Sequence, residues 1–244
     1  MSRIRLDQHL VNLGLAESRS KAKAAIEAGN VSVDGEVAKT ASLKVEESAS
    51  ISYTDAHRWV GRGALKLDHA FSLWALDVQD KVVLDVGAST GGFTEVCLDR
   101  GAAKVFAVDV GQGQIHPRVG MNPRVVNLEK TDARELTTDL ITQAPDLIVC
   151  DASFISLSKV LPVALSLAQS GAQLMTLVKP QFEAENPSGV GKKGVVKDPE
   201  AHQAAVAKVS DWLESVGWTV NAVADSPITG GDGNVEFLLW ATRR

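Results

Sequence analysis

Cysteine and long apolar runs are scarce in this sequence, and each absence excludes a class of protein. Two cysteines among 244 residues, Cys97 and Cys150, form no disulfide framework and favour a reducing compartment. No stretch approaches the roughly 20 apolar residues of a membrane helix. The first residues also lack the apolar stretch of a signal peptide. We therefore expect a cytoplasmic protein with no membrane partner.

Metal-ligand patterns and net positive charge are also missing. The five histidines form no H-x-x-x-H or Cys/His pair, so we expect no metal site. The formal net charge of −5 argues against a wholly basic nucleic-acid binder. The first 25 residues nevertheless carry five basic and two acidic side chains. Such a local patch can bind phosphate, because the field near a site matters more than the total charge.

Two regions of the chain carry different patterns. Residues 1–57 predict two short helices and a small sheet, with Asp34-Gly35 as a tight-hairpin signal. Residues 64–244 predict an α/β domain, because strand-like runs alternate with helices as in a parallel, doubly wound sheet. The polar segment 58–63 is the expected linker. The expected strands are 81–86, 104–110, 124–128, 145–151, 172–179, 218–225 and 235–241, and the expected helices are 63–75, 91–100, 156–168 and 198–216.

The seven expected strands end in two close neighbours, which suggests that the last strand is inserted antiparallel. The expected fold class is therefore a seven-stranded Rossmann-like domain preceded by a small α+β domain. A chain of this length accommodates one large domain, or one medium and one small domain.

A glycine-rich turn follows the first strand of the larger region. A dinucleotide site needs G-x-G-x-x-G, and Gly87, Gly91 and Gly92 do not have that spacing. Asp85 would repel a pyrophosphate, but it could help to hold a cationic amino-acid moiety. The turn therefore favours S-adenosylmethionine, with a plain strand–turn–helix corner as the alternative. The candidate cofactor residues of this segment are Asp85, Gly87, Ala88, Ser89, Thr90, Gly91, Gly92 and Phe93.

Three further carboxylates are cofactor candidates. Asp109 ends the next strand, roughly twenty residues on, where an acid can bond ribose hydroxyls. Asp132 follows the third strand, where this fold often places an adenine contact, although a helix N-cap is an equally good interpretation. Asp151 ends the fourth expected strand at the same edge of the sheet.

Several long motifs in the same order resemble the TlyA family of RNA ribose methyltransferases, historically also called hemolysins. The larger domain is similar to FtsJ-type ribose methyltransferases. The N-terminal region resembles the S4-type RNA-binding domain of a ribosomal small-subunit protein and of several pseudouridine synthases. The motifs that carry the resemblance are 85–94, DASFISL at 151–157, KPQFE at 179–183 and NVEF at 234–237, with 5–7, 14–20, 29–31 and 34–35 in the N-terminal region.

The resemblance implies a Lys–Asp–Lys–Glu catalytic pattern, which falls on Lys66, Asp151, Lys179 and Glu236. The predicted topology alone brings the last three to one edge of the sheet, whereas the family pattern alone adds Lys66. A lysine can act as a general base when burial or a nearby cation favours its neutral form. We assign this role to Lys179, oriented by Asp151 and Glu236, with Lys66 positioning the nucleotide and acting electrostatically on Lys179. Taken singly, Lys66 could be a solvated surface residue, and Glu236 an edge-strand charge.

Basic side chains are the candidates for RNA contact. Arg19 and Lys23 lie one helical turn apart, a spacing that can grip phosphates without reading bases. On charge alone a solvated helix face is a slightly better interpretation, and the resemblance favours RNA. Arg58-Trp59 could stack on a base or wedge the two domains, and residues 187–194 predict a basic loop near the catalytic edge. The RNA candidates are Arg3, Arg5, Arg19, Ser20, Lys21, Lys23, Arg58, Arg62, Lys192 and Lys193.

The expected function is S-adenosylmethionine-dependent 2′-O-methylation of ribose in ribosomal RNA or ribosomal subunits, with cytidine implied by the resemblance. Ala-Ser-Phe follows Asp151 in place of the Pro-Pro-aromatic motif of amino-group methyltransferases, which favours an oxygen target.

Cys97 and Cys150 suit core positions better than thiolate catalysis. The rival functions are a membrane-active hemolysin, a nicotinamide oxidoreductase and a non-catalytic ribosome-assembly factor.

Overall fold

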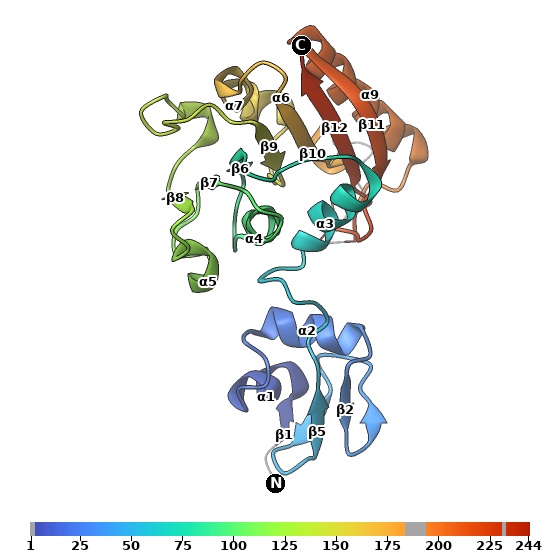
Figure 1. The fold of residues 1–244 in the computed structure, drawn as a ribbon. Helices are drawn as coiled ribbons and strands as arrows, with labels where there is room; N and C mark the ends of the chain where they lie inside the picture. The colour runs from blue at the N-terminus through green and yellow to red at the C-terminus, as the bar shows by residue number, and fades with distance from the viewer. Residues whose placement is uncertain (1–2, 184–193, 231–232) are drawn as a thin grey trace. The chain divides into compact units, whose positions relative to one another are not determined.

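The computed structural model describes residues 3–183, 194–230 and 233–244 (Figure 1). The chain divides into two compact units, Met1–Arg62 and Gly63–Arg244. The division falls inside segment 58–63, where the change of sequence pattern led us to expect a linker.

The first unit packs two helices against short strands. Ser18 caps its second helix, because the Ser18 hydroxyl accepts a hydrogen bond from the Lys21 main-chain N–H at 3.2 Å. Leu6 and Leu10 of the first helix and Ile26 of the second are almost completely buried in a common core. The elements are β1 Arg3–Arg5, α1 Leu6–Asn12, α2 Arg19–Glu27, β2 Val31–Val33, β3 Glu36–Val37, β4 Lys44–Glu46 and β5 Ile51–Tyr53.

The strands of this unit form two small sheets. β1 pairs with β4, and the second sheet has the order β3-β2-β5. Asp34 and Gly35, both with positive φ, form the hairpin turn between β2 and β3. The hairpin that this dipeptide predicted is therefore confirmed.

The second unit is built on a seven-stranded sheet with the order β11-β12-β10-β9-β6-β7-β8 (Figure 1). β12 runs antiparallel to both of its neighbours, as predicted for the last strand, and the β10-β9-β6-β7-β8 pairs are parallel. The strand order reverses between β6 and β9, the position where open α/β sheets bind their ligands. The strands are β6 Val82–Val86, β7 Lys104–Asp109, β8 Val125–Glu129, β9 Leu147–Cys150, β10 Gln173–Val178, β11 Trp218–Asp225 and β12 Phe237–Arg243.

Helices cover both faces of this sheet. Leu84 and Val86 of β6 belong to the core cluster that contains residues of α6, α7 and α9. Side chains alternate along a strand, so Asp85 points to the other face, where it contacts Thr94 of α4. The helices of this unit are α3 Ala64–Leu73, α4 Gly92–Asp99, α5 Pro117–Gly120, η1 Ala133–Glu135, α6 Leu157–Val160, α7 Pro162–Leu167, α8 Pro180–Glu183 and α9 Pro199–Ser215.

The helix expected over 156–168 and the strand expected over 235–241 differ from the sequence-based expectation in ways that concern the site. The single helix expected over 156–168 is divided at Leu161, because Pro162 begins a new helix and has no N–H to continue the old one. The last strand begins at Phe237 rather than Val235, so Glu236 precedes it. β12 is also flanked by β10 and β11, so the alternative of an edge-strand charge at Glu236 was wrong.

Candidate active site

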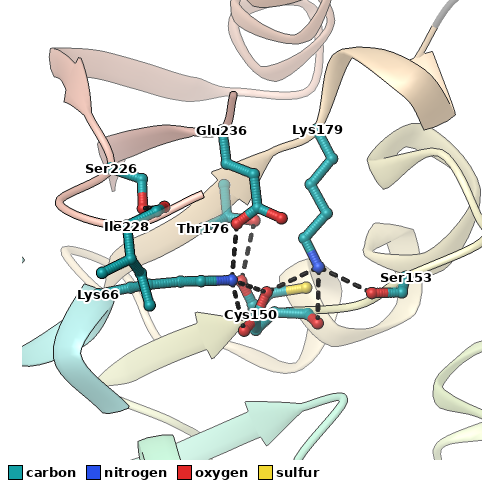
Figure 2. Close-up of polar contacts among 9 residues, drawn as sticks. Lys66, Cys150, Ser153, Thr176, Lys179, Ser226, Ile228 and Glu236 are labelled. Atoms are coloured by element: carbon teal, nitrogen blue, oxygen red, sulfur yellow. Dashed lines mark hydrogen bonds and ion pairs between the residues drawn. The ribbon is translucent and has the colours of Figure 1, made fainter. Parts of the chain in front are cut away.

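Four charged residues from distant parts of the second unit meet at one edge of its sheet. Asp151 directly follows β9, and Lys179 directly follows the adjacent parallel strand β10. Glu236 precedes the antiparallel strand β12, whose first residue pairs with the last residue of β10. Lys66 comes from the first turn of α3. Figure 2 shows the side chains of Lys66, Lys179 and Glu236 converging on the same small region.

The two lysines share the carboxylate of Asp151. Lys66 Nζ lies 3.2 Å from Asp151 Oδ2 and 2.6 Å from Glu236 Oε2. Lys179 Nζ lies 2.7 Å from Asp151 Oδ1. Lys179 also donates hydrogen bonds to Ser153 Oγ at 2.8 Å and to the main-chain carbonyl of Asp151 at 3.2 Å (Figure 2).

Burial makes this network unusual. Lys66, Lys179 and Glu236 are only 6, 5 and 3% exposed, although lysine and glutamate are among the residues least often buried. A buried charge is tolerated when it is paired and hydrogen-bonded, and here two cations face two carboxylates. The Asp151 side chain retains 19% exposure. This arrangement excludes the interpretation of Lys66 as a solvated surface residue.

Two glycines leave room for the carboxylates of the network. A Cβ added to Gly230 would lie 2.5 Å from Glu236 Oε1, which is closer than real contacts allow. A Cβ added to Gly63 would lie 3.3 Å from Asp151 Oδ2. No sequence pattern around Gly230 predicted its close approach to the Glu236 carboxylate.

The loop after Asp151 carries an exposed aromatic ring. Phe154 is 90% exposed and has a φ of 65°, a left-handed conformation that is uncommon for a bulky residue. Its ring centroid lies 5.2 Å from that of Phe182, in the segment after Lys179. Both residues lie inside motifs of the sequence, DASFISL at 151–157 and KPQFE at 179–183, but no role was predicted for either of them.

Glu183 joins the two loops that carry these residues. Its buried carboxylate accepts hydrogen bonds from the Ser156 hydroxyl at 2.7 Å and from the Leu157 main-chain N–H at 2.8 Å. The carboxylate thereby satisfies the start of α6 and ties the segment after β9 to the segment after β10. The relative position of Phe154 and Lys179 is therefore fixed by a hydrogen-bonded clamp.

The glycine-rich turn between β6 and α4 adopts a backbone that an ordinary residue resists. Gly87, Ser89 and Gly91 have φ values of 82°, 48° and 90°. A Cβ on Gly87 would approach Ala152 Cα to 3.0 Å, so the turn lies against the residue that follows Asp151. Ser89 and Thr90 are exposed, whereas Ala88, Gly91, Gly92 and Phe93 are buried.

Asp85 lies beneath this turn and is fully buried. Thr94 Oγ1 donates a 2.6 Å hydrogen bond to Asp85 Oδ2. Burial raises the pKa of Asp85 to about 7, although the Thr94 hydrogen bond acts in the opposite direction. The other oxygen, Oδ1, is buried and has no hydrogen-bond partner among the residues that the structure describes.

Asp109 and Asp132 have different surroundings. Asp109 accepts hydrogen bonds from the main-chain N–H groups of Ser89 at 2.8 Å and Gly111 at 2.7 Å, which links the end of β7 to the glycine turn. Asp132 is the N-cap of η1 and also binds the guanidinium of Arg134, which lowers the pKa of Asp132. The helix-cap interpretation of Asp132 is therefore confirmed, and the adenine contact stays a prediction.

The predicted RNA-contacting residues of the first unit are not equivalent. Arg5 and Arg19 both bind the carboxylate of Asp7. Lys21 is only 8% exposed and donates to the main-chain carbonyl of His57 at 3.1 Å, so its charge is directed inward. Arg3, Ser20 and Lys23 are exposed.

The remaining RNA candidates lie around segment 58–63 and in the basic loop. The Arg58 guanidinium lies 4.2 Å from the centre of the Trp59 ring, and both Arg58 and Arg62 are exposed. Lys192 and Lys193 fall outside the described residues. Over residues 3–183, 194–230 and 233–244, no group of three or more His, Cys, Asp or Glu side chains could hold a metal ion.

Both cysteines are buried core residues, as their sequence context predicted. Burial raises the pKa of the Cys150 thiol to about 12, and that of the Cys97 thiol well above its usual value. A reactive thiolate is therefore disfavoured at both positions. In the part of the chain that the structure describes, no helix has both the length and the apolarity needed to cross a membrane.

Family models match both units. An FtsJ-like methyltransferase model matches residues 59–243, and an S4 domain model matches residues 4–51. A structure from Listeria monocytogenes, named as an S-adenosylmethionine-dependent methyltransferase, has a TM-score of 0.57 at 16% identity, covering 75% of this chain and 100% of that one. That likeness concerns the fold alone.

Closer relatives match nearly the whole chain. The 16S/23S rRNA (cytidine-2′-O)-methyltransferase TlyA of Mycobacterium tuberculosis is 46% identical over 240 residues, which are 98% of this chain and 89% of that protein. Hemolysin A of Brachyspira hyodysenteriae is 36% identical, with 96 and 98% covered. A Streptococcus thermophilus structure named as a hemolysin has a TM-score of 0.78 at 35% identity, with 100 and 89% covered. The chain therefore belongs to the TlyA family, and it consists of an S4 domain followed by an FtsJ-like methyltransferase domain.

Proposed function

We propose that the protein transfers a methyl group from S-adenosylmethionine to the ribose 2′-hydroxyl of a cytidine in ribosomal RNA. The observation that carries this proposal is the buried network in which Asp151 holds both Lys66 and Lys179, beside the glycine turn. The names of the TlyA relatives supply the cytidine and the ribosomal RNA. In this proposal residues 1–57 bind RNA, 58–63 connect the domains and 64–244 catalyse the transfer.

The residues around the glycine turn fit a sulfonium cofactor that carries an amino acid. The buried Asp85 Oδ1, which has no partner among the described residues, suits the ammonium group of a methionine moiety. Gly87 allows close approach of the backbone, and Asp109 retains lone pairs that can accept from ribose hydroxyls. We propose that Ser89 and Thr90, which are exposed, face the same ligand. S-adenosylmethionine, when bound, supplies an electrophilic methyl group.

Lys179 is the proposed general base. It must receive the proton of the 2′-hydroxyl as the sugar oxygen forms its new bond to carbon. The Asp151 carboxylate, 2.7 Å from Lys179 Nζ, then stabilises the resulting ammonium. The hydrogen bond to Ser153 fixes the direction of the Lys179 side chain. The protein thus supplies alignment and a proton acceptor.

Lys66 and Glu236 are proposed to set the charge of this site. Lys66 contacts the same carboxylate as Lys179, and two cations that share one carboxylate repel each other. Glu236, 2.6 Å from Lys66 Nζ, holds Lys66 in place and compensates its charge.

The exposed ring of Phe154 is a proposed platform for the target base. It lies in the loop between Asp151 and the clamp formed by Glu183, and its 90% exposure leaves a ring face free for stacking. Stacking of a base on an aromatic side chain contributes about 1–3 kcal/mol. A target nucleotide held there would present its ribose toward Lys179.

The test is methyl transfer to purified 30S subunits, 50S subunits and free ribosomal RNA with labelled S-adenosylmethionine. We expect label in RNA and, after digestion to nucleosides, its recovery as 2′-O-methylcytidine. Recovery in a base-methylated nucleoside would contradict the oxygen target, and absence of label from all three substrates would contradict the proposal as a whole. Leakage of dye from liposomes incubated with the pure protein would favour the hemolysin interpretation instead.

A further inference from the structure

A cavity in the first unit lies outside the catalytic machinery. It has a volume of about 610 Å³ and opens between the junction of β1 and α1, one face of α2 and the segment 39–42. Four basic side chains and two carboxylates line it. The charged lining residues are Arg5, Asp7, Arg19, Lys23, Glu27 and Lys39.

Asp7 lies at the floor of this cavity and is 4% exposed. The Arg5 guanidinium donates to it through Nε at 3.0 Å and Nη2 at 3.1 Å. The Arg19 guanidinium donates through Nε at 3.1 Å and Nη2 at 2.7 Å. The hydrogen bonds from Arg5, followed by those from Arg19, lower the pKa of Asp7 to about 2. These hydrogen bonds therefore favour the charged form of the carboxylate.

The backbone around Asp7 is fixed as well. Its own N–H donates to the carbonyl of Ala41 at 3.1 Å, and the preceding N–H of Leu6 donates to the carbonyl of Leu43 at 2.7 Å. Asp7 Oδ1 also accepts from the main-chain N–H of Gln8 at 3.0 Å. The carboxylate is thus a rigid anchor rather than a mobile surface charge.

Both arginines keep donors that face away from this anchor. A guanidinium has five N–H donors, and Asp7 engages two nitrogens, Nε and Nη2, of each one. The Nη1 groups make no hydrogen bond to a described residue, and the side chains are 47 and 55% exposed. Planar donor pairs of this kind match the oxygens of a phosphate.

We propose that Asp7 is a positioning residue that fixes Arg5 and Arg19 as one rigid receptor for a single phosphate of the RNA backbone. Lys23 and Lys39 lie on the same cavity and attract the adjoining phosphates. Contacts of this kind set the register of an RNA without reading its sequence. The inference deepens the proposed function, since it assumes that RNA is the substrate.

Simple electrostatics and a positioning role for Asp7 predict opposite effects of neutralising Asp7 on RNA binding. Removal of a negative charge from a cavity that binds RNA should tighten binding if only the local field matters. If Asp7 acts by fixing the two arginines, its neutralisation should instead weaken binding. Glu27 is the matched control, because it lines the same cavity, pairs with Lys23 at 3.6 Å and contacts neither arginine.

The experiment compares binding of a ribosomal RNA fragment to wild-type protein, Asp7→Asn and Glu27→Gln across a series of salt concentrations. We expect Asp7→Asn to weaken binding about tenfold, the loss of a well-aligned charge-assisted contact, and Glu27→Gln to leave it unchanged or tighter. Equal or tighter binding by folded Asp7→Asn would overturn the proposal. Thermal melting of each variant establishes that it is folded.

A double variant keeps the test valid if Asp7→Asn does not fold. The protein that carries both Arg5→Lys and Arg19→Lys retains both charges but loses the two planar guanidinium groups. We expect it also to bind RNA about tenfold more weakly. Wild-type affinity in this variant would overturn the proposal. Failure of the proposed function has a different signature, because wild-type protein would then bind no ribosomal RNA or transfer no methyl group to it.

Discussion

Each unit of the molecule contains one carboxylate that holds two basic side chains, and the two clusters differ in cation and in exposure. In the S4 unit Asp7 holds two arginines whose side chains are 47 and 55% exposed. In the methyltransferase unit Asp151 holds two lysines whose side chains are 8 and 6% exposed. The carboxylates also differ, since the Asp7 side chain is 6% exposed and that of Asp151 19%.

In our proposal this difference separates a cluster that binds RNA from a cluster that takes part in the reaction. Arginine keeps its charge at every accessible pH, so exposed guanidinium groups on a fixed carboxylate suit the recognition of a phosphate. Lysine can lose its proton when burial or another cation disfavours the ammonium form. We propose that the same ionic motif serves affinity for RNA in one unit and proton transfer in the other.

The largest expected effect follows from breaking the buried cluster. Asp151→Asn removes the carboxylate that both lysines share. We expect the rate of methyl transfer to fall about 10²- to 10⁴-fold, which is the usual contribution of general acid–base catalysis by a positioned side chain. Removal of one partner from a buried ion pair also costs about 3–5 kcal/mol of stability. Single-turnover methyl transfer and urea unfolding measure the two effects.

The control for this variant is Asp139→Asn, which neutralises an exposed carboxylate of the same unit. We expect wild-type behaviour from it in both assays. Methyl transfer by Asp151→Asn within a factor of about two of the control would remove the shared carboxylate from the mechanism.

Asp85 extends the comparison to a carboxylate that holds no cation. Its pKa is raised from 3.8 to about 7 by burial, whereas the pKa of Asp7 is lowered to about 2 by its arginines. The folded state therefore binds a proton at Asp85 that the unfolded state releases, and this contribution to stability is fully present below about pH 4 and is lost as the pH rises towards 7. Its size is a few kcal/mol, because one pKa unit corresponds to about 1.4 kcal/mol.

Urea unfolding of wild-type protein and Asp85→Asn across this pH range measures the contribution. We expect the variant to lose the decline in stability between pH 4 and 7, because its amide does not titrate. A parallel pH dependence in the two proteins would contradict the assignment.

Phe154 tests whether the reacting cluster has a binding surface of its own. We expect Phe154→Ala to raise the KM for RNA about tenfold, consistent with the loss of one base stack. Its stability should change little, because the side chain is 90% exposed. Phe154→Tyr retains the ring face and should behave like the wild type. An unchanged KM for the alanine variant would leave Phe154 without a role in substrate binding.

The smallest expected effect lies on the exposed cluster. Lys23 pairs with Glu27 at 3.6 Å on the surface of α2, and its side chain is 59% exposed. Lys23→Ala should change the free energy of unfolding by less than about 0.5 kcal/mol. It should reduce the slope of log affinity for RNA against log salt by about one, as expected for one phosphate contact. An unchanged slope would remove Lys23 from the contact surface.

The sheet and most of the reacting cluster could be predicted from the sequence because they depend on chain topology. Apolar runs alternate with helical segments in residues 81–241, and parallel strands place their carboxyl ends at one edge. Asp151 and Lys179 therefore had to be neighbours. Glu236 joined them through the antiparallel last strand, although that strand begins two residues later than its β-propensity indicated.

The remaining features depend on tertiary contacts that leave no local pattern. Lys66 belongs to a helix outside the sheet, and only the family resemblance brought it into the predicted site. Lys21 lies in a basic helical segment, but its ammonium group donates a hydrogen bond to the main-chain carbonyl of His57, 36 residues further along the chain. No local pattern predicts this contact. The hydrogen bonds of Glu183 to Ser156 and Leu157, and those of Arg19 to Asp7, could likewise not be predicted. Each of them joins segments that are separated in the sequence.

Lys179→Ala examines whether a buried amine beside Asp151 accepts the proton of the ribose hydroxyl. The measurement is single-turnover methyl transfer to ribosomal RNA, with binding of S-adenosylmethionine and RNA determined on the same samples. We expect a rate about 10²- to 10⁴-fold below that of the wild type with both ligands still bound. A methyl-transfer rate close to that of the wild type would contradict this role of the amine.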